Sequence, residues 1–179
     1  MGNKERNLPY TLNLTQNLSI NFSDFANLGG FDEEIHRGQD IELGFRAVQN
    51  GFNIHYIPDA LAFHNDPINI DQLTHKTRRD HRQLVILFKK YPHILKDLDY
   101  LEDKLPVDWK RDSPGLKMRK LVRQIQAGWL FRIANIHVCK IFERYWPHQS
   151  LLKFLLWKIV GSYQLIGLRD GIRQYGWKP

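Results

Sequence analysis

The residues with the clearest chemical potential lie between positions 29 and 64, in the segment GGFDEEIHRGQDIELGFRAVQNGFNIHYIPDALAFH. Asp40 precedes a run in which Ile41 and Phe45 would share one helical face, so we expect a helix to begin there. A helix dipole favours the charged form of a carboxylate at its N-terminus. Such a carboxylate could accept a proton from a substrate hydroxyl if it faced a cleft, or it could serve only as the helix N-cap. The spacing leaves both roles open.

Two further features of this segment could contact a ligand. His64 ends a short apolar run and could offer a neutral imidazole nitrogen to a divalent cation, although a lone histidine is more often structural. Gly29 and Gly30 permit positive φ and a close approach of a ligand to the backbone, but most such pairs are ordinary turns. The sequence contains neither a GxGxxG motif nor a P-loop.

The elements that must position these residues are short and mixed up to about residue 96. Even spacing of Leu12, Leu14, Leu18 and Ile20 favours a strand. Asn50-Gly51 is a helix C-cap signal, and Glu42 and Arg46 are spaced to form an i,i+4 ion pair. The expected helices span 24–28, 41–50 and 71–91, and the expected extended segments span 53–57 and 60–63.

Charge divides the chain unevenly. Residues 1–115 contain 14 Lys and Arg against 17 Asp and Glu, whereas residues 116–179 contain 12 against two. The segment 97–115 is charged, contains Pro106 and Pro114, and separates the two parts. We therefore predict a first domain over 1–96, a linker over 97–115 and a basic helical tail over 116–179. The single Cys139 excludes an intramolecular disulfide and a cysteine-based zinc cluster.

The basic tail should bind a polyanion. We expect two helices, 116–145 and 151–175, each interrupted by Lys or Arg and so not convincing as membrane spans. Their tryptophans, flanked by basic residues, fit helices lying in a membrane interface, and a helical bundle packed on the first domain is the open alternative. No nucleic-acid-binding motif is present, and the first residues show no apolar signal-peptide region. We therefore expect a cytoplasmic protein, peripheral at the anionic inner face of the membrane.

The order of the motifs carries a resemblance to a known family. Gly29–Glu33 is a Gly-Gly-Phe-Asp-Glu turn, Gln39-Asp40 opens a helix that continues with Leu-x-x-Arg, and 51–58 reads Gly-Phe-Asn-Ile-His-Tyr-Ile-Pro before His64. Residues 12–95 thereby resemble the C-terminal half of the catalytic domain of family-2, GT-A-fold glycosyltransferases and the related galactosyltransferase C-terminal module. One departure is Gln39, where the family usually has Glu.

The resemblance implies an α/β fold, the acceptor-side half of a GT-A-like domain with short strands and helices, followed by the basic helical tail. It implies an inverting transfer from a nucleotide-sugar to an acceptor hydroxyl with Asp40 as general base, and Mg²⁺ or Mn²⁺ with His64 as a metal ligand. The acceptor-binding residues it implies are Gly29, Gly30, Phe31, Asp32, Glu33 and Gln39.

The same resemblance implies a nucleotide-binding half with an Asp-x-Asp motif before residue 12, and only Asp97-Leu-Asp99 fits that pattern, well downstream. We therefore expect the isolated chain to be inactive. It would be a split-gene subunit whose missing N-terminal half is a separate chain, a truncated product or a relic. The alternative function is a non-catalytic module that binds an anionic membrane surface.

Overall fold

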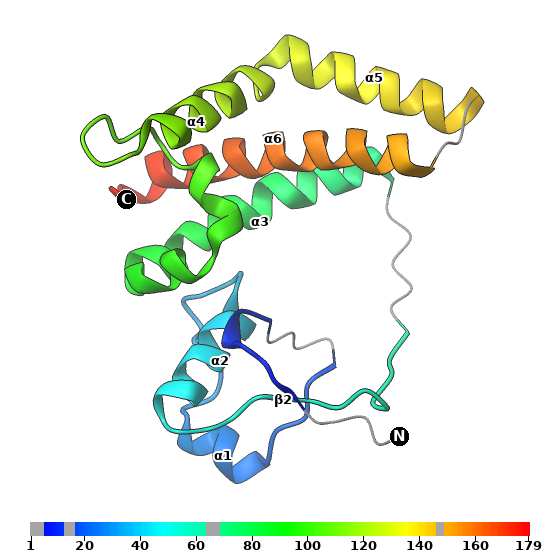
Figure 1. The fold of residues 1–179 in the computed structure, drawn as a ribbon. Coiled ribbons are helices and arrows are strands. Elements are labelled where there is room, and N and C mark those ends of the chain that lie inside the picture. The colour runs from blue at the N-terminus through cyan, green and yellow to red at the C-terminus, as the bar shows by residue number, and fades with distance from the viewer. Residues whose placement is uncertain (1–5, 13–16, 64–68, 146–148) are drawn as a thin grey trace. The chain divides into compact units, whose positions relative to one another are not determined.

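The computed structural model describes residues 6–12, 17–63, 69–145 and 149–179 (Figure 1). The chain divides into two compact units, residues 1–67 and residues 68–179. We refer to them as the first unit and the helical unit. This division lies earlier in the chain than the 97–115 linker that we predicted, because the helix that follows residue 69 packs with the C-terminal helix.

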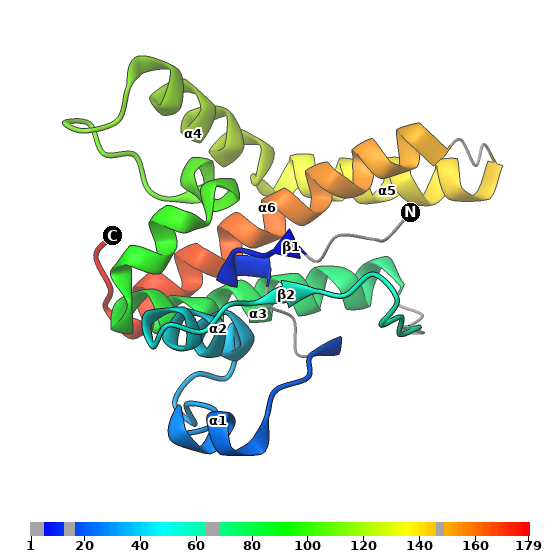
Figure 2. The same ribbon diagram turned by 60° about the horizontal axis from the view of Figure 1, so that its bottom comes forward.

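The first unit contains one small antiparallel sheet and two helices. Strand β1 (Arg6–Asn7) pairs with β2 (His55–Tyr56), with Arg6 opposite Tyr56 (Figure 2). A 3₁₀ turn, η1 (Tyr10–Leu12), follows β1, and helices α1 (Phe22–Asn27) and α2 (Gln39–Gln49) lie between the strands in the sequence. Asn21 caps α1 by accepting a hydrogen bond from the Ser23 amide at 3.0 Å.

The predicted α/β, GT-A-like fold is wrong. In the part of the chain that the structure describes, the only strands are the two-residue β1 and β2, and helices dominate. The described residues of the evenly spaced apolar pattern form no strand: Leu12 ends a 3₁₀ turn, and Leu18 and Ile20 are exposed. Leu14 lies outside the described residues. A strand needs a neighbour to satisfy its backbone groups, and alternation over a few residues cannot supply that neighbour.

The helical unit is built on two long helices that pack along each other. Helix α3 (Ile70–Lys90) confirms the predicted helix 71–91, and it lies against α6 (Gln149–Tyr175) (Figure 1). The predicted helix 116–145 is instead two helices, α4 (Pro114–Gln126) and α5 (Trp129–Tyr145). They are separated at Gly128, a residue that weakens a helix interior.

Two glycines of α6 set how closely α3 and α6 approach. A Cβ atom on Gly167 would lie 2.4 Å from the Arg78 carbonyl oxygen, and one on Gly171 would lie 2.4 Å from the Arg82 carbonyl oxygen. Such separations leave no room for a side chain, so the backbones touch directly. The buried side chains of Val85, Leu87, Phe88, Leu165 and Leu168 complete this interior.

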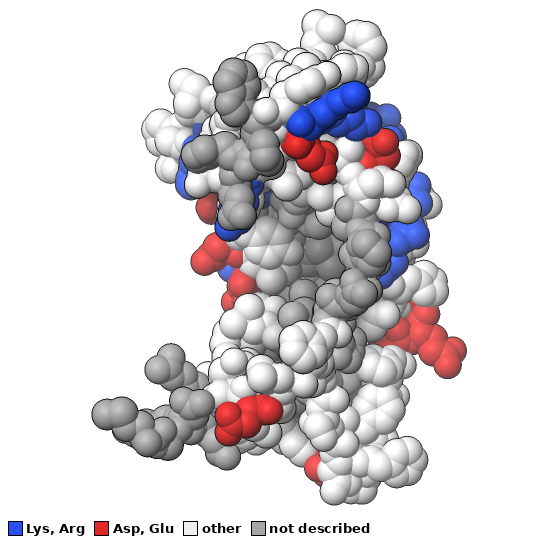
Figure 3. Space-filling view, turned by 90° about the vertical axis from the view of Figure 1, so that its right-hand side faces the viewer, with Lys and Arg blue, Asp and Glu red and all other residues white. Residues whose placement is uncertain are grey.

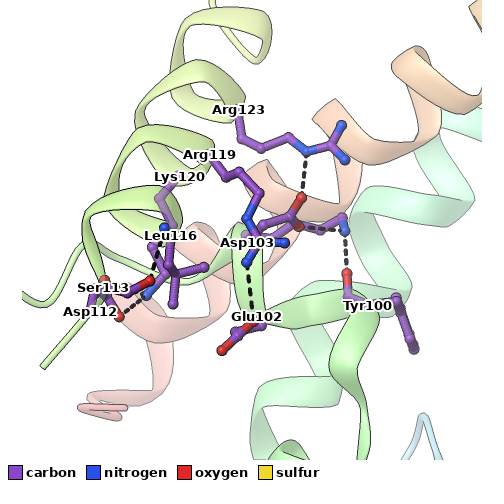
Figure 4. A network of polar contacts seen from close by, with 10 residues as sticks. Tyr100, Glu102, Asp103, Asp112, Ser113, Leu116, Arg119, Lys120 and Arg123 are labelled. Atoms are coloured by element: carbon purple, nitrogen blue, oxygen red, sulfur yellow. Dashed lines mark hydrogen bonds and ion pairs between the residues drawn. The ribbon is translucent and has the colours of Figure 1, made fainter.

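The predicted linker 97–115 is instead an ordered part of the helical unit. The 3₁₀ helix η3 (Pro92–Asp97) ends at the first residue of this segment, and a second 3₁₀ helix, η4 (Asp99–Lys104), lies within it. Its acidic residues pair with basic residues of α4: Asp103 accepts from Arg123 at 2.7 Å, and Asp112 accepts from the almost fully buried Lys120 at 2.7 Å (Figure 4). The acidic segment and the basic tail thus neutralise each other in part. Counting the charges of residues 1–115 and 116–179 separately does not show this pairing.

Basic charge on the helical unit is accordingly interrupted by carboxylates. In the space-filling view, Lys and Arg side chains of this unit lie beside Asp and Glu side chains (Figure 3). Arg78 of α3 pairs with Asp170 of α6 at 2.6 Å, and Lys140 of α5 lies 3.3 Å from Asp71. The tail therefore does not present a uniformly basic surface.

Helix α6 is the one helix in the described ranges that is long and apolar enough, over Ser150–Tyr175, to cross a membrane by length and composition. The core helix of a globular bundle passes the same test, so this is weak evidence. Helix α6 contacts α3, α4 and α5 within its unit, which is the position of a core helix.

Candidate functional site

Asp40 lies in the first turn of α2 and is not its N-cap. The helix begins at Gln39, and Gly38 occupies the capping position with a positive φ of 82°. The Asp40 Oδ1 atom accepts a hydrogen bond from the neighbouring Ile41 amide at 3.0 Å. The residue is partly exposed and lies at the positive end of the helix dipole.

Arg46 fixes the Gly29-Gly30 turn to the same helix. Its guanidinium makes a bidentate pair with the fully buried Glu42, with Nη2 at 2.7 Å from Oε2, which confirms the predicted i,i+4 pair. The same group also donates to the carbonyl of Leu28 and, at 2.6 Å, to that of Gly30. Charge-assisted bonds in a buried place are strong, so this clamp defines where the turn lies.

The turn that Arg46 holds presents some of its side chains to solvent. Gly29 and Gly30 have φ of 84° and 69°, values that favour glycine. Phe31 packs edge-to-face on Phe25 with ring centroids 5.2 Å apart, yet 45% of it is exposed. Asp32 accepts from the Glu34 amide at 3.1 Å and shapes the turn itself. The exposed Phe31 and Glu33 are therefore the turn residues best able to contact a ligand.

The structure thus attaches most of the predicted site residues to one helix. Gln39 and Asp40 belong to the first turn of α2, and Arg46, six residues further on and about 9 Å along the axis, holds the Gly29-Gly30 turn. Sequence spacing alone could not link Arg46 to this turn, because the partners lie 16 and 18 residues apart. The predicted metal ligand, His64, lies outside the described residues.

The C-terminal end of α2 follows its sequence signal. Asn50 ends the helix and Gly51 adopts a φ of 83°, which confirms the predicted C-cap. The Gly51 amide donates to the Val48 carbonyl and the Phe52 amide donates to the Ala47 carbonyl, each at 3.0 Å. This bond pattern is a Schellman motif, and it directs the chain from α2 into β2.

The described residues do not form a metal-binding site. Within them, no group of three or more His, Cys, Asp and Glu side chains is arranged to hold a metal ion. Asp97 and Asp99, which match the Asp-x-Asp pattern, lie on η3 and η4 of the helical unit and are exposed. The described residues therefore supply no ligand set of their own for the predicted Mg²⁺ or Mn²⁺, and with His64 outside them the metal site stays a prediction.

Comparison with known proteins gives one short similarity. No family model matches the chain, and no solved structure matches it significantly. Two curated proteins named pre-mycofactocin glycosyltransferase, from the CDC 1551 / Oshkosh and ATCC 25618 / H37Rv strains of Mycobacterium tuberculosis, are each 40% identical to the chain over 43 residues. The match covers 24% of this chain and only 9% of each of those proteins. A segment of this chain is therefore similar in sequence to a glycosyltransferase.

Proposed function

We propose that the first unit is the acceptor-side segment of an inverting, family-2-like glycosyltransferase, with Asp40 as its general base. The observation that carries the proposal is the 43-residue similarity to a glycosyltransferase. The partly exposed Asp40 at the start of α2 supports it, because a base must be able to reach the acceptor. The helix that carries Asp40 also anchors the Gly29-Gly30 turn, the proposed acceptor wall.

In this reaction the acceptor hydroxyl oxygen attacks the anomeric carbon of a nucleotide-sugar. The bond from that carbon to the nucleoside diphosphate breaks, and the configuration at the carbon inverts. Asp40 takes the hydroxyl proton as the new bond forms, and Phe31 and Glu33 contact the acceptor. A divalent cation would stabilise the leaving diphosphate, but we assign it no step, because the described residues provide no ligand set.

The donor site is proposed to lie on another segment or chain. We expect no binding when this chain is titrated calorimetrically with UDP and Mn²⁺. Micromolar binding would contradict the proposal that the donor site lies elsewhere, while leaving the role of Asp40 open to the test that follows.

The general base is tested in this chain together with the part that supplies the donor site. UDP-glucose, UDP-galactose and GDP-mannose are offered in turn, and acceptor-dependent release of nucleoside diphosphate is measured. Asp40→Asn should lower turnover by roughly 10²–10⁴-fold and cost no more than about 1 kcal/mol of stability from the lost charge–dipole interaction. Asp59→Asn, a change at an exposed aspartate of the same unit, is the control and should retain turnover.

Two results would count against this proposal. Wild-type turnover in the Asp40→Asn variant would exclude Asp40 as the base. A lack of acceptor-dependent nucleotide release with every donor, across a panel of hydroxyl-bearing sugar and peptide acceptors, would contradict the transferase assignment.

A further inference from the structure

The surface where α4 and η4 meet α6 combines hollows, aromatic rings and cations. Three adjoining hollows, of about 330, 300 and 220 Å³, each include Arg123 in their lining. The middle one is lined by Arg123, Lys153, Phe154, Trp157 and Lys158, and we call these five residues the aromatic–basic face. Trp157 is 79% exposed and Phe154 is 57% exposed, which is unusual for side chains of their size.

An exposed apolar stripe on α4 continues this face. Leu116 and Lys120 turn inward, which leaves Met118, Val122 and Ile125 pointing outward at i, i+4 and i+7 spacing. Met118 and Val122 line the hollow next to the aromatic–basic face. Scattered exposed apolar residues need no explanation, but a contiguous group marks an interaction site.

The charge of this face is positive. Lys158 lies over the Phe154 ring, with Nζ 5.3 Å from the ring centroid. Of the described residues that line the three hollows, one is acidic: Asp103. Asp103 accepts hydrogen bonds from both Arg123 and Lys104, so its charge is already compensated. Lys153 and Lys158 therefore attract an anion to a surface that also exposes the apolar rings of Phe154 and Trp157.

We propose that the aromatic–basic face binds the surface of a bilayer that contains anionic phospholipids. Trp and Phe side chains enter the interfacial region while Lys ammonium groups contact lipid phosphates. Lysines 153 and 158 suit this arrangement, because a long apolar stem lets the charged end reach the phosphate level. This inference goes beyond the proposed transferase function and does not depend on it.

The proposal is tested first by sedimentation of the full chain with vesicles at low salt. We expect binding to vesicles of equal parts phosphatidylcholine and phosphatidylserine, and none to vesicles of phosphatidylcholine alone. High salt should weaken the binding without abolishing it, because salt screens exposed charges and does not remove apolar contacts. Equal binding to both vesicles, or no binding to either, would overturn the proposal.

The second step separates this face from net charge. A Lys near an anionic surface strengthens binding by roughly 1 kcal/mol, or about fivefold. Lys153→Glu with Lys158→Glu should therefore weaken vesicle binding by about 25-fold or more. Lys96→Glu with Arg111→Glu changes the net charge equally at exposed positions off this face, and should weaken binding far less. Equal losses in the two double variants would show general electrostatic attraction and overturn the assignment to this face.

The third step locates the aromatic residues. Brominated lipids quench tryptophans that enter the bilayer, so vesicle-bound wild-type protein should lose fluorescence. Trp157→Phe should remove much of that quenching, whereas Trp109→Phe, at an exposed tryptophan outside the hollows, should not. Both changes are conservative and exposed, so folding is not at risk. Unchanged quenching in Trp157→Phe would exclude insertion at this face.

Discussion

The two units of the molecule are held together in different ways. In the described part of the first unit the buried apolar side chains are Ile35, Leu43 and Ala47, and the charged Glu42 is buried as well. The helical unit instead buries an extended apolar interior along α3 and α6, with glycines at the closest contacts. The candidate catalytic site thus lies in the unit with the smaller core, where a polar clamp has to define the geometry.

The contrast predicts different weak points. Removing one charge of the buried ion pair in the first unit should leave its partner without a counter-charge. The few apolar contacts of this unit add too little stability to offset that loss. Adding one methyl group to the helical unit should force its long helices apart, because the interior is already close-packed. The predictions that follow test each unit at its own weak point.

The largest effect is expected from Arg46→Met. This change leaves Glu42 buried without its cation and removes the donor to the Gly30 carbonyl. Breaking a buried ion pair typically costs roughly 3–5 kcal/mol, a loss that the small core of the first unit cannot absorb. Hydrogen exchange should therefore rise throughout α1 and α2 and stay unchanged in α3 and α6. The double variant with Glu42→Leu should recover part of the protection, and full protection in Arg46→Met alone would refute the clamp.

The next effect is expected from Gly171→Ala in the helical unit. The new Cβ would lie 2.4 Å from the Arg82 carbonyl oxygen and 2.7 Å from a Val85 methyl carbon. Overpacking of this kind costs roughly 1–3 kcal/mol, so the urea midpoint of this unit should fall. Gly115→Ala is the matched control, because no atom lies within 4 Å of its added Cβ and a fitting Ala stabilises by about 0.4–1 kcal/mol. Equal midpoints in both variants would exclude close helix contact.

The features that the sequence predicted correctly are local ones. The α3 helix, the Asn50-Gly51 cap and the Glu42–Arg46 pair each depend on residues within a few positions of one another. The extended segment predicted over 53–57 contains β2, whereas the strand predicted from the spacing of Leu12 to Ile20 failed because pairing depends on a distant neighbour. The linker failed because Arg123 lies 20 residues from its partner Asp103. The four-residue spacing of Gly167 and Gly171 places both glycines on one helical face and indicates close helix packing. The sequence patterns of charge and hydropathy do not reveal this feature.

The candidate site follows the same rule. Asp40 could be assigned to the start of a helix from its neighbours, although its position within the first turn could not. The bonds from Arg46 to the Leu28 and Gly30 carbonyls join segments that no spacing rule connects. His64 lies outside the described residues, so its predicted role as a metal ligand stays a prediction.

One pH effect should arise from His81 in the helical unit. Burial lowers the pKa of His81 below its usual 6.5, opposed by the bond to the Thr77 carbonyl and by Asp80 and reinforced by Lys104. The unfolded chain then takes up the proton first, so stability should fall as the pH drops below 6.5, by at most about 1.4 kcal/mol per pH unit. His81→Gln should flatten this part of the urea-unfolding profile. An unchanged slope of stability against pH would mean that a group other than His81 causes the effect.

Asp103 should affect the stability of the helical unit in a lower pH range. Hydrogen bonds from Arg123 and Lys104 hold the pKa of Asp103 below its usual 3.8, despite the opposing and largest single effect of burial. Its stabilising contribution is therefore present above pH 3.8 and is lost as the pH falls below that value. The His81 effect begins at the higher pH, below 6.5, so the His81 comparison can be made above pH 3.8, before these ion pairs are affected.

The smallest effect concerns how each unit begins its principal helix. Helix α3 starts with a capping box: Asn69 Oδ1 accepts from the Gln72 backbone amide at 2.8 Å, and Gln72 Oε1 accepts from the Asn69 backbone amide at 3.0 Å. The N-cap of α2 is instead Gly38, which has no side chain to accept a hydrogen bond. Asn69→Ala should therefore cost about 1 kcal/mol of stability in the helical unit, measured by urea unfolding. Asn69→Asp keeps the acceptor and should be neutral. Equal destabilisation by both variants would mean that the amide group of Asn69, and not the cap, is what stabilises this end of α3.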